Sequence, residues 1–93
     1  QMRIVVEYTA QVKKAAGVGK EEYEIAEGST LQELVKQVAE KHAGSLKSIL
    51  FPTSDELHPS ILLFVSNQQV LWEEPLTLEP HHVVTILSPI SGG

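Results

Sequence analysis

Cysteine is absent from all 93 residues of the sequence. This absence excludes disulfides, a thiolate nucleophile, and zinc or iron–sulfur centres held by cysteine. It fits a reducing compartment, and we expect a cytoplasmic protein.

Long apolar runs are also missing, because no stretch approaches the roughly 18 residues that span a bilayer. The first residues lead directly into a strand-like alternation and lack the layout of a signal peptide. Gln1 is interpreted as an expression remnant ahead of a natural start at Met2. We therefore predict no association with a membrane.

Positive charge is scarce, since seven Lys and Arg stand against twelve Asp and Glu, for a net charge of −5. Affinity for nucleic acid comes mostly from Lys and Arg on phosphates, so a nucleic-acid partner is not expected. An acidic surface suits a partner with a basic surface, or it serves solubility alone.

The composition is 42% hydrophobic and 20% charged, which indicates a globular chain with enough apolar surface for a core. The length predicts one domain over residues 1–93. Residues 88–93 are predicted to be an extended, flexible C-terminal tail.

The N-terminal third predicts two strands and a short helix. Residues 2–8 alternate, with Ile4, Val6 and Tyr8 on one face of a strand. Residues 9–16 favour a short helix that Gly17 can end. Residues 21–26 alternate again, and their closeness in sequence suggests a hairpin-like return.

A longer helix is predicted to begin near Ser29. Thr30 with Glu33 matches a capping box, and Ser29 with Gln32 is the competing register. Gly44 is the expected stop. The apolar positions at helical spacing are Leu31, Leu34, Val35, Val38 and Ala39.

The second half predicts further strands. Residues 46–51 are compatible with either a helical turn or an extended piece, and residues 52–59 read as a loop. Residues 61–65 form a continuous apolar run, typical of a strand that is covered on both faces or lies inside a sheet. The last strand is predicted at residues 82–87.

Smaller features complete the order of elements. A polar turn is expected at residues 66–69, a short return strand at residues 70–72, and a loop with buried Leu76 and Leu78 before the last strand. The order predicts an α+β fold with the main helix packed on one face of a mixed sheet. Pairing the first and last strands in parallel at the centre would bury both apolar runs, which is a β-grasp arrangement.

Histidine and carboxylate patterns give no convincing catalytic or metal site. His42, His58, His81 and His82 are interpreted as surface histidines, because no carboxylate stands at ligand spacing. The pairs at residues 21–22 and 73–74 are interpreted as solvated charge. Ser29 is better explained as a helix cap than as a nucleophile.

The chain closes with Gly92 and Gly93, behind Pro89. A terminal carboxylate is an anion at neutral pH and a poor electrophile, so it must be activated before it can react. An activating enzyme would have to thread it into a narrow nucleotide site, where side chains at the last two positions would obstruct. Pro89 restricts Ser88 to extended geometry, which lowers the entropy lost on threading.

Several segments resemble the ubiquitin-like sulfur carriers of the MoaD/ThiS family, most of all the small subunit of molybdopterin synthase (MoaD type). They are MRIVVEYTAQVKKAAG, STLQELVKQVAEKHA, ILLFVSNQQV and VVTILSPISGG. The resemblance covers nearly the whole chain. The order of these segments, with Gly-Gly at the end, is more specific than any one of them.

The resemblance implies a β-grasp fold and a protein co-substrate without catalytic machinery or a bound cofactor of its own. An E1-like adenylating enzyme (MoeB/ThiF type) would use ATP to adenylate Gly93. A sulfur donor protein would then convert the adenylate to a thiocarboxylate. The large synthase subunit (MoaE type) would use that sulfur to build the dithiolene of molybdopterin. The partner-binding residues implied are Leu87, Pro89, Ile90, Ser91 and Gly92.

Some positions depart from the family pattern. Ser88 stands where a first proline is common, Lys13 and Lys14 replace an Arg-Glu pair, and residues 51–60 look like an insertion. Alternatives within the class are a thiamine-pathway carrier (ThiS type), a carrier for tRNA thiolation and a lysine-linked modifier. The alternative from another class is a β-grasp interaction module.

Overall fold

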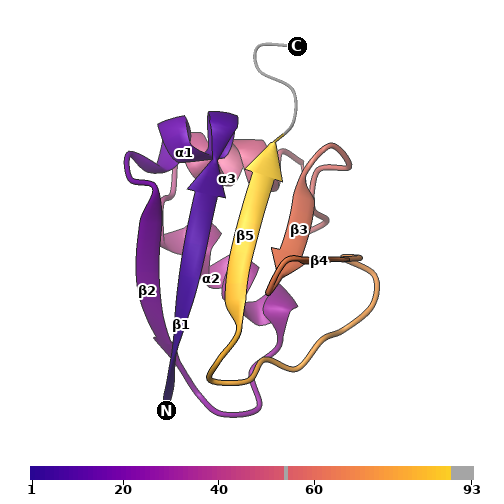
Figure 1. Cartoon of the computed structure of the whole chain (residues 1–93). Coiled ribbons are helices and arrows are strands. Elements are labelled where there is room, and N and C mark those ends of the chain that lie inside the picture. Colours follow the sequence, from indigo (N-terminus) through magenta and orange to yellow (C-terminus); the bar gives the residue numbers. More distant parts are fainter. Residues whose placement is uncertain (54, 89–93) are drawn as a thin grey trace.

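The computed structural model describes residues 1–53 and 55–88, so Ser88 is the one residue of the predicted tail that it covers. Figure 1 shows the arrangement of its helices and strands. The elements in chain order are β1 (Met2–Thr9), α1 (Ala10–Ala16), β2 (Lys20–Ile25), α2 (Leu31–Lys41), α3 (Ser45–Leu50), β3 (Leu62–Val65), β4 (Gln68–Val70) and β5 (Val83–Ser88).

The strands form a mixed sheet in the order β2-β1-β5-β3-β4. β1 and β5, the first and last strands, lie parallel at the centre, while the other neighbours are antiparallel (Figure 1). The predicted central pairing and β-grasp arrangement are confirmed.

The helices pack on one face of this sheet. Ile4, Val6 and Tyr8 of β1 are buried, as the alternation predicts, and they join Val84 and Ile86 of β5 in a single core. The five apolar positions predicted for α2 are all buried against them. Burying each of these larger side chains contributes about 1.5–3 kcal/mol, which explains why the sheet and helix associate.

The start of α2 confirms one of the two predicted capping registers. The Thr30 side chain accepts from the Glu33 backbone N–H at 3.1 Å, and the Glu33 carboxylate accepts from the Thr30 N–H at 2.9 Å. Each group satisfies a backbone donor that the first helical turn leaves without a partner. The register through Ser29 is therefore not the one used.

The predicted stop of α2 at Gly44 is wrong. α2 ends at Lys41, and Gly44 instead precedes α3 with a φ of 120°. Glycine reaches this conformation without a Cβ clash, so it turns the chain into a second helix. The ambiguous segment at residues 46–51 is helical over most of its length, and Leu46 and Leu50 fill the core.

The hairpin after β3 differs from the prediction by two residues. β4 covers Gln68–Val70 rather than residues 70–72, because Ser66 and Asn67 make a two-residue turn. Both have positive φ, of 47° and 73°, as type I′ hairpin turns require. The turn is thus shorter than the polar stretch suggested.

β3 lies inside the sheet, between β5 and β4, as one of the two predicted possibilities stated. It is not covered on both faces, however. Leu63 and Val65 are buried, whereas Leu62 and Phe64 are half-buried on the side away from the helices. In the loop before β5, two buried leucines were predicted. Leu78 is buried, whereas Leu76 is only partly buried and packs against the core.

Candidate functional site

The described part of the predicted site is the end of β5. Leu87 pairs with Thr9 of β1 on one side and with Leu62 of β3 on the other. Ser88 is 6% exposed and forms a parallel bridge with Ala10. Leu87 is therefore paired on both sides, and Ser88 is paired on the side of β1 and α1. Pro89, Ile90, Ser91, Gly92 and Gly93, which were predicted as site residues, lie outside the described residues.

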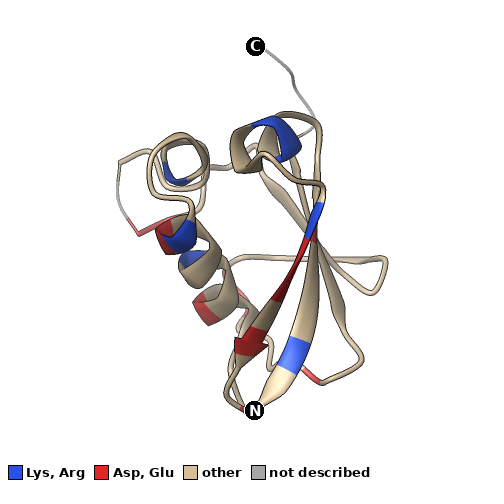
Figure 2. Cartoon of the chain, turned by 90° about the vertical axis from the view of Figure 1, so that its left-hand side faces the viewer, with Lys and Arg blue, Asp and Glu red and all other residues tan. Residues whose placement is uncertain are grey.

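Beside this end, the chain turns sharply from β1 into α1. Ala10 has a φ of 55°, a left-handed conformation that costs a non-glycine residue about 1–3 kcal/mol. The turn places α1 at the same end of the molecule as the last residues of β5 (Figure 1). Lys13 and Lys14 of α1 are exposed, so this end of the molecule carries cationic residues (Figure 2).

The sheet face away from the helices carries apolar side chains from β1, β5 and β3. Leu62 and Leu87 are direct partners, and Phe64 and Val83 lie on the same face, each half-buried. Val5 pairs with Val83 at the start of β5, and Glu7 and Thr85 lie between this pair and Leu87 on the same face. This group, called here the open apolar face, is defined by Val5, Leu62, Phe64, Val83 and Leu87. Half-buried apolar residues on a face that no described helix covers suit contact with a partner protein.

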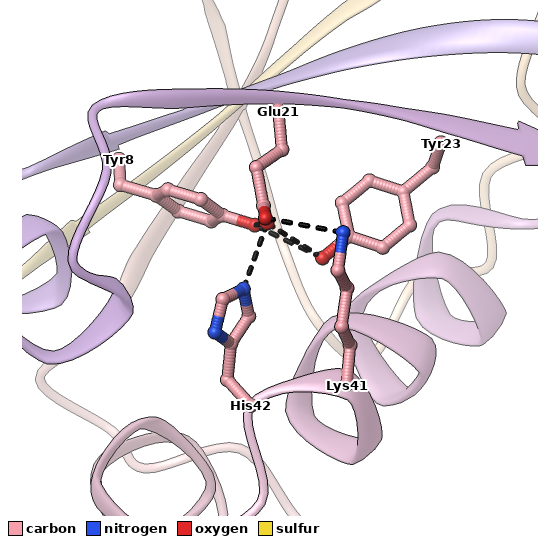
Figure 3. A network of polar contacts seen from close by, with 5 residues as sticks. All are labelled: Tyr8, Glu21, Tyr23, Lys41 and His42. Atoms are coloured by element: carbon pink, nitrogen blue, oxygen red, sulfur yellow. Dashed lines mark hydrogen bonds and ion pairs between the residues drawn. The ribbon is translucent and has the colours of Figure 1, made fainter.

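A network of polar contacts lies elsewhere, between β2 and the end of α2 (Figure 3). Glu21 Oε1 accepts hydrogen bonds from Tyr8 Oη at 2.7 Å, Tyr23 Oη at 2.9 Å and His42 Nε2 at 2.8 Å. Lys41 Nζ lies 3.1 Å from Glu21 Oε2. We call these five residues the Glu21 network. It links β1, β2 and α2 through one carboxylate.

The hydrogen bonds decide the protonation of this carboxylate. Burial alone would raise the pKa of Glu21, but hydrogen bonds from His42, Tyr8, Tyr23 and Lys41 outweigh it and lower the pKa to about 2. Burial raises the pKa of Tyr23 to about 12 and raises that of Tyr8 as well. A carboxylate with so low a pKa is a weak base, so the network suits holding elements together rather than proton transfer.

Two predictions from the sequence are wrong here. Glu21 is not a solvated charge, since its side chain is 15% exposed, and His42 is not a surface histidine, since its side chain is 17% exposed. The two residues are 21 positions apart, so no local pattern indicated their contact. The sequence does place Tyr8, Glu21 and Tyr23 on two neighbouring predicted strands. Their contact could have been predicted only with the register between β1 and β2.

Of the remaining histidines, His81 and His82 are adjacent, and His58 lies in a different loop. His58 Nδ1 accepts from the Ser60 N–H at 3.0 Å, and His82 Nδ1 accepts from the Glu79 N–H at 2.9 Å. Among residues 1–53 and 55–88, no three His, Asp or Glu side chains are grouped to hold a metal ion.

Comparison with known proteins identifies the family. The ThiS family matches residues 6–93, which is nearly the whole chain. The chain belongs to the ThiS family. Over 92 residues this ThiS-family chain is 25% identical to the molybdopterin synthase sulfur carrier subunit of Chlamydomonas reinhardtii. The match covers 99% of this chain and 100% of that protein. The prediction of a MoaD/ThiS-type sulfur carrier is confirmed.

Solved structures show which fold the chain shares. SAMP1 from Haloferax volcanii superposes with a TM-score of 0.85 at 18% identity, covering 98% of this chain and 99% of that one. Urm1 from Trypanosoma brucei superposes with a TM-score of 0.78 at 18% identity, covering 98% and 95%. At these identities the likeness concerns the fold, which is the ubiquitin-like β-grasp predicted from the sequence.

The described helices are all too short or too polar to cross a bilayer.

Proposed function

We propose that the C-terminal carboxyl of Gly93 is the group on which this sulfur carrier transports sulfur, and that molybdopterin synthesis receives it. The observation that carries the proposal is the family match, which runs through Gly92 and Gly93. The related carrier subunit of molybdopterin synthase supports the choice of pathway. In this proposal the folded domain has no catalytic machinery of its own and no bound cofactor.

The chemistry requires activation, because a carboxylate resists attack by a nucleophile. The Gly93 carboxylate displaces pyrophosphate from ATP in the active site of an E1-like enzyme and becomes an acyl adenylate. A sulfur nucleophile then attacks the carbonyl carbon and displaces AMP, which leaves a thiocarboxylate. Gly92 and Gly93 present no side chain to the narrow passage that this enzyme needs.

The open apolar face would provide the docking surface for both partner enzymes. It lies next to the point where β5 ends, and Leu87 belongs to both. A partner that covers this face would hold the chain end near its own active site. Pro89, Ile90 and Ser91 would then lie along the passage that leads to the reacting carboxyl.

An assay of intact mass tests the carrier proposal. The full chain is incubated with an E1-like enzyme, ATP and sodium sulfide, and a chain lacking Gly93 serves as the control. We expect a mass increase equal to replacing one oxygen by sulfur, only in the full chain and only with ATP. No increase with any cognate activating enzyme, or the same increase in the control, would overturn the proposal.

A second assay tests the acceptor. The thiocarboxylated chain is mixed with the large subunit of molybdopterin synthase and the sulfur-free pterin precursor, and dithiolene formation is measured. We expect stoichiometric loss of sulfur from the chain. Loss of sulfur only to tRNA or to a thiazole precursor, or conjugates on lysines in cells, would replace molybdopterin with one of the alternative pathways.

A further inference from the structure

A groove lies at the β4 edge of the sheet, away from the Glu21 network. It has a volume of about 240 Å³ and is lined by the loop at residues 57–59, the first residues of β3, and the chain at residues 69–73. Leu71, one of its lining residues, is 51% exposed. We call this the edge groove. It combines apolar residues with the carboxylate of Glu73 and the ring of His58.

The chain that follows β4 along the groove is held firmly. Gln32 of α2 donates from Nε2 to the carbonyls of Trp72 and Glu74, at 2.9 and 3.1 Å. The Trp72 ring packs against Phe51 with centroids 5.6 Å apart. A groove that is already formed loses less conformational entropy when it binds a ligand.

His58, one of the residues that line the edge groove, can donate a hydrogen bond. Its Nδ1 accepts from the Ser60 backbone N–H, so the neutral ring carries its hydrogen on Nε2. This hydrogen is suited to a carbonyl oxygen of an incoming peptide. The groove therefore offers an apolar lining, polar groups on His58 and Gln69, and the carboxylate of Glu73.

The charge of this part of the chain indicates what kind of segment fits. All seven Lys and Arg lie at or before Lys47, whereas Asp55, Glu56, Glu73, Glu74 and Glu79 follow it. Residues 48–93 thus account for the whole net charge of −5. The edge groove is built entirely from this acidic part of the chain. A ligand with positive charge is favoured there, and an acidic one is repelled.

We propose that the edge groove is a docking site for a segment of a partner protein that carries an apolar side chain next to lysine or arginine. The apolar side chain contacts Leu71 and Trp72, and the cation pairs with Glu73. A second copy of this chain is disfavoured because two acidic surfaces would meet. The chain's own residues 89–93 are disfavoured because they contain no Lys or Arg.

Titration of the isotope-labelled full chain with the peptide acetyl-KLKLK-amide, followed by NMR, tests the proposal. We expect saturable shifts at the residues that line the groove, and weaker binding as salt rises. Acetyl-KSKSK-amide keeps the charge without the leucines and should bind about tenfold more weakly. Acetyl-ELELE-amide should not bind.

Two pairs of variants sharpen the test. Leu71→Ser should weaken binding about fivefold or more, whereas Val18→Ser, at the other large apolar residue exposed among those described, should not. Glu73→Gln should weaken it about twofold to fivefold, and Glu27→Gln, an exposed acid elsewhere, should not.

Other results would overturn the proposal. If both lysine peptides bind equally well, binding depends on net charge alone and the apolar lining of the groove plays no part. Shifts centred on Leu87 would assign the contact to the open apolar face. Groove shifts that depend on protein concentration without peptide would make a second copy the occupant. None of these outcomes depends on whether Gly93 carries sulfur.

Discussion

Glu21 shows how much a single residue can contribute in this small domain. Its carboxylate accepts hydrogen bonds from two strands and from the end of α2, while only 15% of its side chain is exposed. Hydrogen bonds to a charged acceptor contribute about 1.5–3 kcal/mol each when their removal leaves buried donors without partners. Glu22, the next residue, points to the exposed side of the same strand.

We therefore expect Glu21→Gln to lower the free energy of unfolding by about 2 kcal/mol at neutral pH, because the amide retains some hydrogen bonds but loses the charge. Glu22→Gln is the matched control, and it should cost less than about 1 kcal/mol because its ion pair with Arg3 is exposed. Urea denaturation measures both. Equal losses in the two variants would contradict the role of the network.

The same comparison should depend on pH. The pKa of Glu21 falls from an ordinary value of 4.5 to about 2 on folding, so the folded state favours the ionised form. The stabilisation is complete above about pH 5 and is lost as the pH falls toward 2. The stability difference between the native chain and Glu21→Gln should shrink over this interval. A difference that stays constant down to pH 2 would show that the charge of Glu21 is unimportant.

At the scale of elements, the beginning of α2 determines where the main helix meets the sheet. The capping box at Thr30 is followed at once by Leu31, which is fully buried. The backbone N–H of Leu31 also donates to the carbonyl of Leu76, so the loop before β5 is tied to the same point. A change in the cap therefore affects two segments.

Thr30→Ala should lower the free energy of unfolding by about 1 kcal/mol, because one N–H of the first turn loses its acceptor. Ser29→Ala is the control, since the capping bonds run through Thr30 rather than Ser29. The midpoint of urea unfolding should shift only in the first variant, with an unchanged m value. A larger loss at Ser29 would assign the cap to the other register.

At the scale of the whole molecule, the core and the proposed docking surface lie on opposite faces of the sheet. The helices cover one face of the sheet and the core lies between them and the sheet (Figure 1), while the open apolar face lies on the opposite side. Partner contacts can therefore change without rebuilding the core. This division suits a carrier that is proposed to meet more than one enzyme.

Leu87→Ser should slow thiocarboxylate formation about tenfold, because the variant removes a central apolar contact of the proposed interface. The fold should persist, since Leu87 belongs to the open face rather than the core. Val18→Ser is the control for a loss of exposed apolar surface. An unchanged rate for Leu87→Ser, with normal stability, would place the docking surface elsewhere.

Much of the fold was predictable because its causes are local. The alternation of Ile4, Val6 and Tyr8, the spacing of the apolar residues in α2 and the cap at Thr30 each act within a few positions. The boundaries near Gly44 and Ser66 were less accurate. A glycine such as Gly44 can either end one helix or precede the next. The length of the turn at Ser66 depends on how the two strands of the hairpin pair.

The order of segments and the pair Gly92 and Gly93 were enough to indicate a sulfur carrier of the MoaD/ThiS family, because that resemblance lies in local patterns of residues. The Glu21 network, the open apolar face and the edge groove were decided by the tertiary structure alone. Each joins residues far apart in the chain, such as Glu21 with His42 and Leu62 with Leu87. Such contacts follow from the register between strands and from the packing of helices, which no short stretch of sequence specifies.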